Sequence, residues 1–146
     1  MSSQPPSLKV QVWIYWKNLE NPTLLFLILH THSTRGGFWQ PVTGGVEPGE
    51  SLLDAAQREA EEETGLIFPF PPQSLEKNFE FVSRGRVNRE YGYFLAVSGD
   101  EKTLPKIRLD QREHTDYLWV PAEIALEKVR YPSNREMLQL LVDRLA

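Results

Sequence analysis

The sequence predicts a single α/β domain that spans residues 1–146. Short apolar runs rich in Val, Ile, Trp and Tyr predict strands in the first part of the chain, and a well-capped segment near its middle predicts a helix. Two further segments with apolar residues at helical spacing follow near the end. A chain of 146 residues with 40% hydrophobic content is large enough to bury one sizeable core.

Two strands are predicted at the beginning of the chain. Residues 8–16 alternate partly between apolar and polar side chains, and residues 24–29 form a continuous apolar run, which predicts a strand buried on both faces. Asn21 and Pro22 interrupt the sequence between them. Residues 34–50 contain five of the nine glycines and two prolines, so they predict a structured loop.

The segment from Leu52 to Thr64 carries the clearest helix signal. Ser51 is a good N-cap, Asp54 completes a capping box, and Gly65 is a typical residue to end the helix. The residues between these caps are strong helix formers. The sequence therefore predicts a helix over residues 52–64.

The second half predicts a hairpin, one more strand and two helices. Three prolines within residues 69–72 enforce an irregular connection, after which residues 79–82 and 91–97 predict a hairpin around the basic segment 84–89. Residues 117–120 predict a further strand. Residues 122–128 and 134–145 carry apolar residues at helical spacing and predict one short and one longer helix.

Composition excludes several classes of protein. A formal net charge of −4 argues against a general nucleic-acid binder, which needs basic residues to displace counterions, and a phosphate substrate would then require a metal ion. The lack of cysteine excludes disulfides and thiol catalysis and fits the cytoplasm. The longest apolar stretch, residues 24–29, is far too short to cross a bilayer, and residues 1–7 show no targeting signal.

A cluster of carboxylates lies on the predicted helix. Charged runs on helices are usually solvated surface, but Glu59 and Glu63 extend the stripe that begins with Leu52 and Ala56. Like charges four residues apart near the negative end of the helix dipole destabilise a helix. Glu62 flanks the pair, so the three glutamates can converge on Mg²⁺, which prefers oxygen ligands and shares its remaining positions with phosphates.

Arg58 precedes this cluster and has two interpretations. It is either a surface side chain or the partner of Glu50 or a neighbouring glutamate in a salt bridge that holds the loop against the helix.

The same segment resembles a complete Nudix box. Its pattern is Gly44, five residues, Glu50, seven residues, and then residues 58–66 as Arg-Glu-apolar-any-Glu-Glu-any-Gly-apolar. The resemblance implies an α/β/α sandwich with a mixed sheet, a loop-helix-loop catalytic motif and hydrolysis of a nucleoside diphosphate linked to another group. It further implies a Mg²⁺ or Mn²⁺ site formed by Gly44, Glu59, Glu62 and Glu63, with Arg58, Glu62 and Glu63 taking part in catalysis.

A narrower resemblance links the chain to the dihydroneopterin triphosphate pyrophosphatases of folate biosynthesis. It rests on residues 38–44, on Glu113 and His114 before residues 117–119, and on residues 133–135, all in the same order. Residues 68–89 match that subgroup poorly. The resemblance implies that Glu113 is the general base, with Glu63 and His114 as competing candidates.

Four other residues are candidates for substrate binding. Arg84, Arg86 and Arg89 are candidates to bind the terminal phosphates, and the alternative is that they only make the surface soluble. Trp39 is a candidate to stack on a pterin or purine ring. His30 and His32 follow a buried strand and are not expected to be ligands.

We therefore expect a pyrophosphohydrolase in which a metal-activated water attacks a phosphorus of the polyphosphate in line. Dihydroneopterin triphosphate or a (d)NTP is the expected substrate, and nucleotide sugars and dinucleoside polyphosphates are alternatives. A sensor that binds a nucleotide without hydrolysing it would be expected to lose metal ligands, whereas Glu59, Glu62 and Glu63 are present. The negative charge weighs against RNA decapping. We expect no stable nucleic-acid or membrane partner, and a monomer or homodimer.

Overall fold

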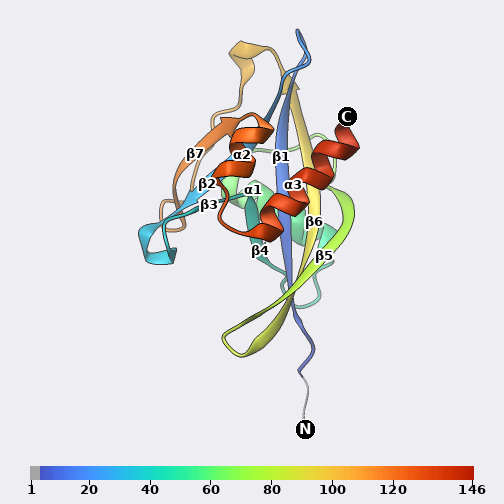
Figure 1. The fold of residues 1–146 in the computed structure, drawn as a ribbon, viewed down its shortest axis with the longest axis vertical. Helices are drawn as coiled ribbons and strands as arrows, with labels where there is room; N and C mark the ends of the chain where they lie inside the picture. Colours follow the sequence, from blue (N-terminus) through green and yellow to red (C-terminus); the bar gives the residue numbers. More distant parts are fainter. Residues whose placement is uncertain (1–3) are drawn as a thin grey trace.

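The computed structural model describes residues 4–146 and consists of one mixed sheet with helices on both faces (Figure 1). The strands are β1 (Ser7–Asn18), β2 (Leu24–Thr31), β3 (Trp39–Gln40), β4 (Val42–Gly45), β5 (Gln73–Ser83), β6 (Arg86–Gly99) and β7 (His114–Val120). The α-helices are α1 (Leu52–Thr64), α2 (Ala122–Lys128) and α3 (Pro132–Leu145), and two short 3₁₀ helices cover Ser33–Arg35 and Glu101–Thr103.

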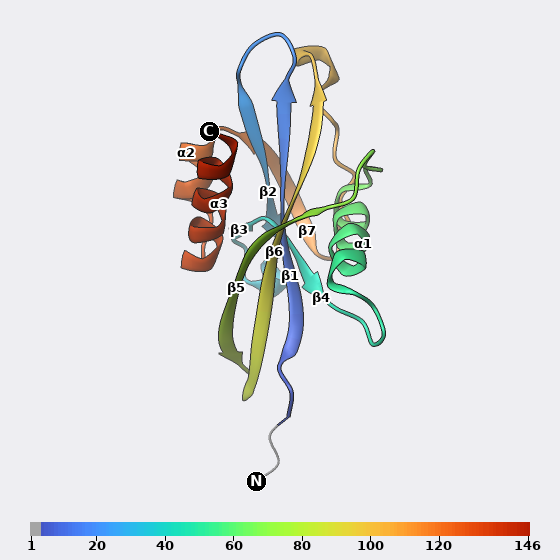
Figure 2. The same ribbon diagram turned by 90° about the vertical axis from the view of Figure 1, so that its right-hand side faces the viewer.

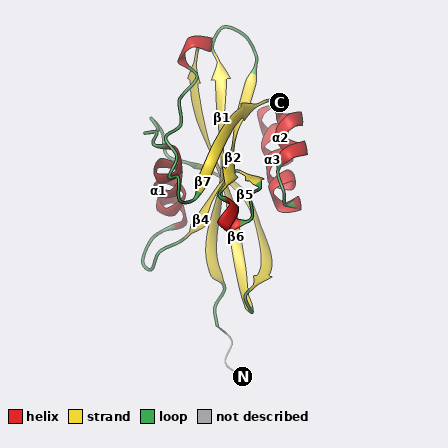
Figure 3. Ribbon diagram, turned by 90° about the vertical axis from the view of Figure 1, so that its left-hand side faces the viewer, coloured by secondary structure: helices red, strands yellow, loops and turns green. Residues whose placement is uncertain are grey.

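Strand β1 is the centre of the sheet. It pairs in parallel with β6 along its whole length and antiparallel with β2 and β4 at its two ends. Strand β5 pairs with β6 and forms one edge of the sheet, and β7 pairs with β2. Helix α1 covers one face, and α2 and α3 cover the other (Figures 2 and 3).

Side chains of β1 point alternately to the two faces of the sheet and contribute to two separate hydrophobic cores. Val10, Val12 and Ile14 pack under α1, together with Ala55, Ala56 and Ala60 of that helix. Trp13 faces the opposite side and packs with the apolar residues of α3, which are Met137, Leu138 and Leu141. Because both faces of β1 are covered, its residues 10–14 are all buried, and they are apolar except for Gln11.

The predicted α/β fold with a mixed sheet is confirmed, and so is the helix over residues 52–64. The Ser51 hydroxyl accepts a hydrogen bond from the Asp54 backbone N–H at 3.1 Å. At the other end Gly65 has a φ of 72°, and its N–H donates to the Glu61 carbonyl. Both ends are thus fixed by the local signals expected of a capped helix.

Several predicted boundaries differ from the structure. The basic segment 84–89 is not a connection between strands, because only Arg84 and Gly85 form the turn and Arg86 already belongs to β6. Both turn residues have positive φ (53° and 74°), which suits a two-residue hairpin turn. The predicted loop 34–50 contains β3 and β4, and α3 begins at Pro132, a residue whose fixed φ suits the first turn of a helix.

Within residues 4–146, none of the helices combines the length and the apolar character needed to cross a membrane.

Candidate active site

The C-terminal half of α1 carries two glutamates into a narrow space against β4. Ala56 and Ala60 anchor the helix on the sheet with no exposed surface. A Cβ atom added to Gly44 would lie 2.1 Å from the Glu59 Cδ atom, so only glycine allows this approach. Glu63, one turn later, is 3% exposed. The stripe predicted from the sequence therefore ends in two largely buried carboxylates.

The two carboxylates have different partners, because Arg58 donates to Glu59 at 2.8 Å while Glu63 lies next to His114. Burial and the neighbouring Glu59 carboxyl raise the pKa of Glu63 well above its ordinary value. The Oε1 atom of Glu63 is buried and accepts no hydrogen bond from a described residue. Its nearest basic atom is Nε2 of His114, at 3.7 Å. A divalent cation with oxygen ligands fits this pair, because it would satisfy the orphaned oxygen and remove the repulsion between the two glutamates.

Arg58 holds the loop before α1 against the helix. Its guanidinium donates from Nε and Nη2 to the two carboxylate oxygens of Glu50, at 2.8 and 2.9 Å, and from Nη2 to the Gly45 carbonyl at 2.9 Å. Nη1 donates to Glu59 at 2.8 Å. Hydrogen bonding to Arg58 lowers the pKa of Glu50 to about 2. The salt bridge predicted for Arg58 is confirmed, and it positions Glu59.

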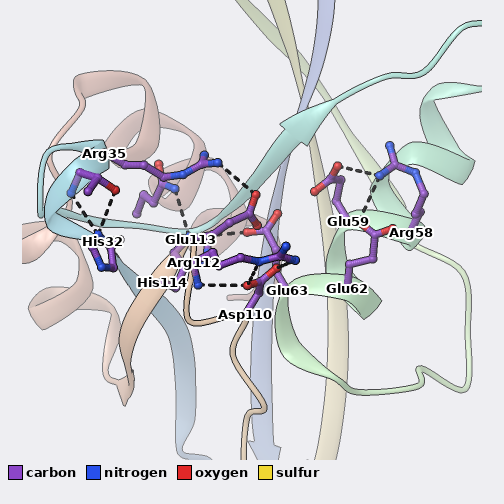
Figure 4. A network of polar contacts seen from close by, with 12 residues as sticks. His32, Arg35, Arg58, Glu59, Glu62, Glu63, Asp110, Arg112, Glu113 and His114 are labelled. Carbon is purple, nitrogen blue, oxygen red and sulfur yellow. Dashed lines mark hydrogen bonds and ion pairs between the residues drawn. The ribbon is translucent and has the colours of Figure 1, made fainter.

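Glu62 lies apart from the buried pair. Its side chain is 61% exposed and contacts Nη1 of Arg58 at 3.3 Å (Figure 4). Among residues 4–146, no three His, Cys, Asp or Glu side chains are gathered as a ready-made metal site. The structure thus brings Glu59 and Glu63 together next to Gly44, whereas Glu62 would have to turn away from Arg58 to join them. The metal-binding roles of Gly44 and Glu62 stay predictions.

A cavity of about 830 Å³ begins at the glutamate pair. Its wall includes acidic and basic groups, with Lys9 and Arg35 as the cations and Glu90 as a further carboxylate. Its aromatic lining residues are Phe38, Phe79, Phe81 and Tyr131, and Ser133 and Asn134 close it from the first turn of α3. The volume and this mixed lining suit a ligand that has both a charged and a flat apolar part.

Two of the three predicted candidates for the base, Glu113 and His114, line this cavity and differ in exposure and in charge. Glu113 is 38% exposed and forms an ion pair with Arg35 at 3.4 Å. His114 is 4% exposed, and burial lowers its pKa to about 4. The Gln40 amide nitrogen lies 3.4 Å from its Nε2 atom, and its Nδ1 atom has no partner among the described residues. His114 is therefore neutral near pH 7, and Glu113 is the more accessible of the two.

The other predicted binding residues lie outside the wall of the cavity. Trp39 packs edge-on against His30, with 4.9 Å between ring centroids. Arg89 pairs with Glu80, and Arg86 donates to the Pro5 carbonyl at 3.2 Å. Arg84 occupies the hairpin turn. The roles assigned to these residues stay predictions.

Among the residues that line the cavity, sequence reasoning missed the charged side chains of Lys9, Arg35 and Glu90 and gave Asn134 no role of its own. Lys9 and Glu90 are opposite each other in the β1–β6 ladder, a pairing that no local pattern reveals. Asn134 belongs to the segment 133–135 that the subgroup resemblance singled out, which was the available signal for it.

Comparison with known proteins places the chain in context. A family model described as the NUDIX domain matches residues 8–141. The chain is 32% identical to a bis(5'-nucleosyl)-tetraphosphatase (asymmetrical) of Mus musculus, over 83% of this chain and 80% of that protein. It is 30% identical to the dihydroneopterin triphosphate diphosphatase of Escherichia coli, over 72% and 75% of the two chains. A similarity of 33% identity to an octanoyltransferase of Myxococcus xanthus covers 81% of this chain, which spans only 32% of that protein.

Solved structures show the same fold. A crystal structure of a C. elegans Ap4A hydrolase superposes with a TM-score of 0.79 at 22% identity, covering 95% of this chain and 97% of that one. The dihydroneopterin triphosphate pyrophosphohydrolase of E. coli gives a TM-score of 0.75 at 24% identity, with 97% and 99% covered. The family match includes α1 and all seven strands except the first residue of β1.

Proposed function

The chain belongs to the Nudix family of hydrolases, which act on pyrophosphate bonds, and we propose that it is a Mg²⁺-dependent pyrophosphohydrolase of a nucleoside-triphosphate-like substrate. Mn²⁺ is the alternative metal. The observation that carries the proposal is the pair formed by the buried Glu63 and the partly buried Glu59, which opens into a cavity large enough for a nucleotide. A pair of this kind binds a cation and, through it, a polyphosphate.

Dihydroneopterin triphosphate or a (d)NTP is the proposed substrate. The resemblance around residues 38–44, 113–119 and 133–135 supports the pterin compound, as does the 30% identity to the E. coli diphosphatase. A dinucleoside polyphosphate is the second candidate, which the 32% identity to the mouse tetraphosphatase favours.

In the proposed mechanism, Glu59 and Glu63 would hold the metal ion, and Glu62 would join them after leaving Arg58. When bound, Mg²⁺ would polarise phosphoryl oxygens and make water a better nucleophile. Lys9 and Arg35, the two cations of the cavity wall, bind and orient the phosphates by charge-assisted hydrogen bonds. Glu113 takes the proton of the water that attacks phosphorus, and its ion pair with Arg35 keeps its carboxyl at the wall of the cavity.

Replacing the base tests this assignment. Glu113→Gln should lower kcat by about a hundredfold or more, the range of general-base catalysis, while KM and metal affinity change little. His114→Gln should stay within about threefold of the wild-type rate, because a residue that is neutral with a pKa near 4 has little driving force to take the proton. Steady-state kinetics and Mg²⁺ titration measure both effects. The assignment to Glu113 is wrong if His114→Gln abolishes turnover and Glu113→Gln does not.

A substrate panel tests the reaction itself. We expect a higher kcat/KM for dihydroneopterin triphosphate than for GTP or dATP, with product masses that identify the bond cleaved. Diadenosine tetraphosphate as the preferred compound would support the second candidate instead. Hydrolysis of a nucleotide sugar at a comparable rate would contradict both, and tight binding without turnover of any compound would make the protein a sensor.

A further inference from the structure

Helix α3 and strand β6 bring two buried polar residues to the same wall of the cavity. A Cβ atom on Gly92 would lie 2.2 Å from the Met137 Sδ atom, and the Arg144 guanidinium lies 5.8 Å from the centre of the Phe94 ring. The helix and the strand therefore run in the same direction in close contact. Asn134 lies one helical turn before Met137, and Glu90 lies two residues before Gly92. Both residues therefore lie toward the same end of this helix–strand contact, and both line the cavity there.

Two consecutive hydrogen bonds determine that Glu90 accepts, rather than donates, at one of its oxygens. The Trp13 indole N–H donates to Gln11 Oε1 at 2.8 Å, and Gln11 Nε2 donates to Glu90 Oε1 at 2.7 Å. An indole nitrogen only donates, so the Gln11 amide has a single orientation and Glu90 Oε1 must accept. Glu90 lines the cavity, where its carboxylate form can only accept hydrogen bonds. Burial raises the pKa of Glu90, whereas the bond from Gln11 and the charge of Lys9 favour its carboxylate form.

Asn134 adds a second unused acceptor. The residue is 2% exposed, and its Oδ1 atom is buried with no hydrogen-bond partner among the described residues. Leaving such an atom unpaired is unfavourable, and a ligand that donates a hydrogen bond to it would remove that cost. Aromatic rings form part of the cavity wall. Phe79 is opposite Glu90 in the β5–β6 ladder, and Phe81 and Tyr131 line the same cavity. A ligand at this wall is therefore a planar ring with adjacent N–H donors on its edge.

We propose that Glu90 and Asn134 recognise the 2-amino-4-oxopyrimidine edge that guanine and the pterins share. That edge presents a ring N–H next to an amino group, which gives two neighbouring donors for the two free acceptors. Adenine presents one amino donor beside a ring nitrogen that only accepts, so it leaves one acceptor unpaired. The inference rests on the proposed function, because it places the base of the polyphosphate substrate at this wall of the cavity.

The test is the binding of nucleoside monophosphates, measured by calorimetry on the full chain without added metal. GMP should bind at least about tenfold more tightly than AMP, since an unpaired buried acceptor costs that much or more. IMP keeps the ring N–H and lacks the amino group, so its affinity should lie between the two. Equal affinities for GMP and AMP in the wild-type protein would overturn the inference without any variant.

Two variants and one control test which residues cause the preference for GMP over AMP. Glu90→Gln keeps the acceptor for Gln11 and turns an N–H donor toward the cavity, so the preference for GMP over AMP should fall to within about twofold. Asn134→Leu keeps the volume and removes the acceptor, and it should reduce the same ratio. Glu136→Gln, which changes an exposed residue of the same helix, should keep the wild-type ratio. Variants that fold and retain the ratio would assign the preference to other residues and reject the inference.

Hydrolysis measured in parallel separates the inference from the proposed function. Cleavage of GTP and ATP with equal kcat/KM, together with equal binding of GMP and AMP, rejects the inference and leaves the enzyme. Selective binding of GMP without hydrolysis of any polyphosphate rejects the enzymatic function and retains the recognition site.

Discussion

Glu63→Gln is expected to lower kcat at least about a thousandfold, which corresponds to about 4 kcal/mol in the barrier. The substitution preserves the size of the side chain but removes a buried carboxyl group that lines the cavity beside Glu59. In the protein without metal this change relieves repulsion and the cost of a buried charge. The melting temperature of the metal-free variant should therefore equal or exceed that of the wild type while turnover is lost.

The neighbouring glutamates give the matched controls for this result. Glu61 lies two positions earlier on the same helix and does not line the cavity, so Glu61→Gln should keep the wild-type rate. Glu62→Gln should approach the loss seen at Glu63 if Glu62 leaves Arg58 to bind the metal. An unchanged rate for Glu63→Gln, with protein that melts normally, would show that the buried pair has no part in the reaction.

Removal of divalent metal should abolish hydrolysis, and its return should stabilise the fold. Without a cation, the buried carboxylates at residues 59 and 63 repel both each other and the polyphosphate. A ligand that binds only the folded state at 100 times its Kd adds about 2.7 kcal/mol to the free energy of unfolding. Mg²⁺ should consequently raise the melting temperature of the wild type measurably, and Glu63→Gln should show a much smaller increase.

Two measurements check this dependence. Activity is assayed after exhaustive chelation and again after addition of excess Mg²⁺ or Mn²⁺, and thermal unfolding is followed at each step. Full hydrolysis after chelation would refute the proposed mechanism. An equal thermal shift in the wild type and in Glu63→Gln would place the stabilising metal at another site.

The part of the site on α1 was predictable because its signals are local. Ser51 and Gly65 mark the ends of the helix through their own backbone geometry, and helical spacing alone places Glu59 and Glu63 on one stripe. The partners of Arg58 also lie within one segment of sequence, with Glu50 eight residues before it. A single sequence thus contains nearly all the information needed for this half of the site.

The other half of the cavity depends on pairings between distant segments. Glu90 meets Gln11 only because β1 and β6 pair in one particular register, and a shift of one residue would turn either side chain to the opposite face. Strands of two and four residues, such as β3 and β4, are too short for a periodic signal. The basic residues 86–89 suggested a connection, whereas they continue β6 beyond a two-residue turn.

The parallel pairing of β1 with β6 has a consequence for how the chain is synthesised. The ladder joins Ser7 to Asn88 and Asn18 to Gly99, so β1 leaves the ribosome well before its longest partner exists. Parallel pairing between remote segments is slow, because the entropy of closing the intervening loop is lost before any contact repays it. Until β6 emerges, the nascent chain exposes Val10, Val12 and Trp13, which the finished protein buries completely. The central strand of the native sheet is therefore exposed to aggregation during translation until β6 is available.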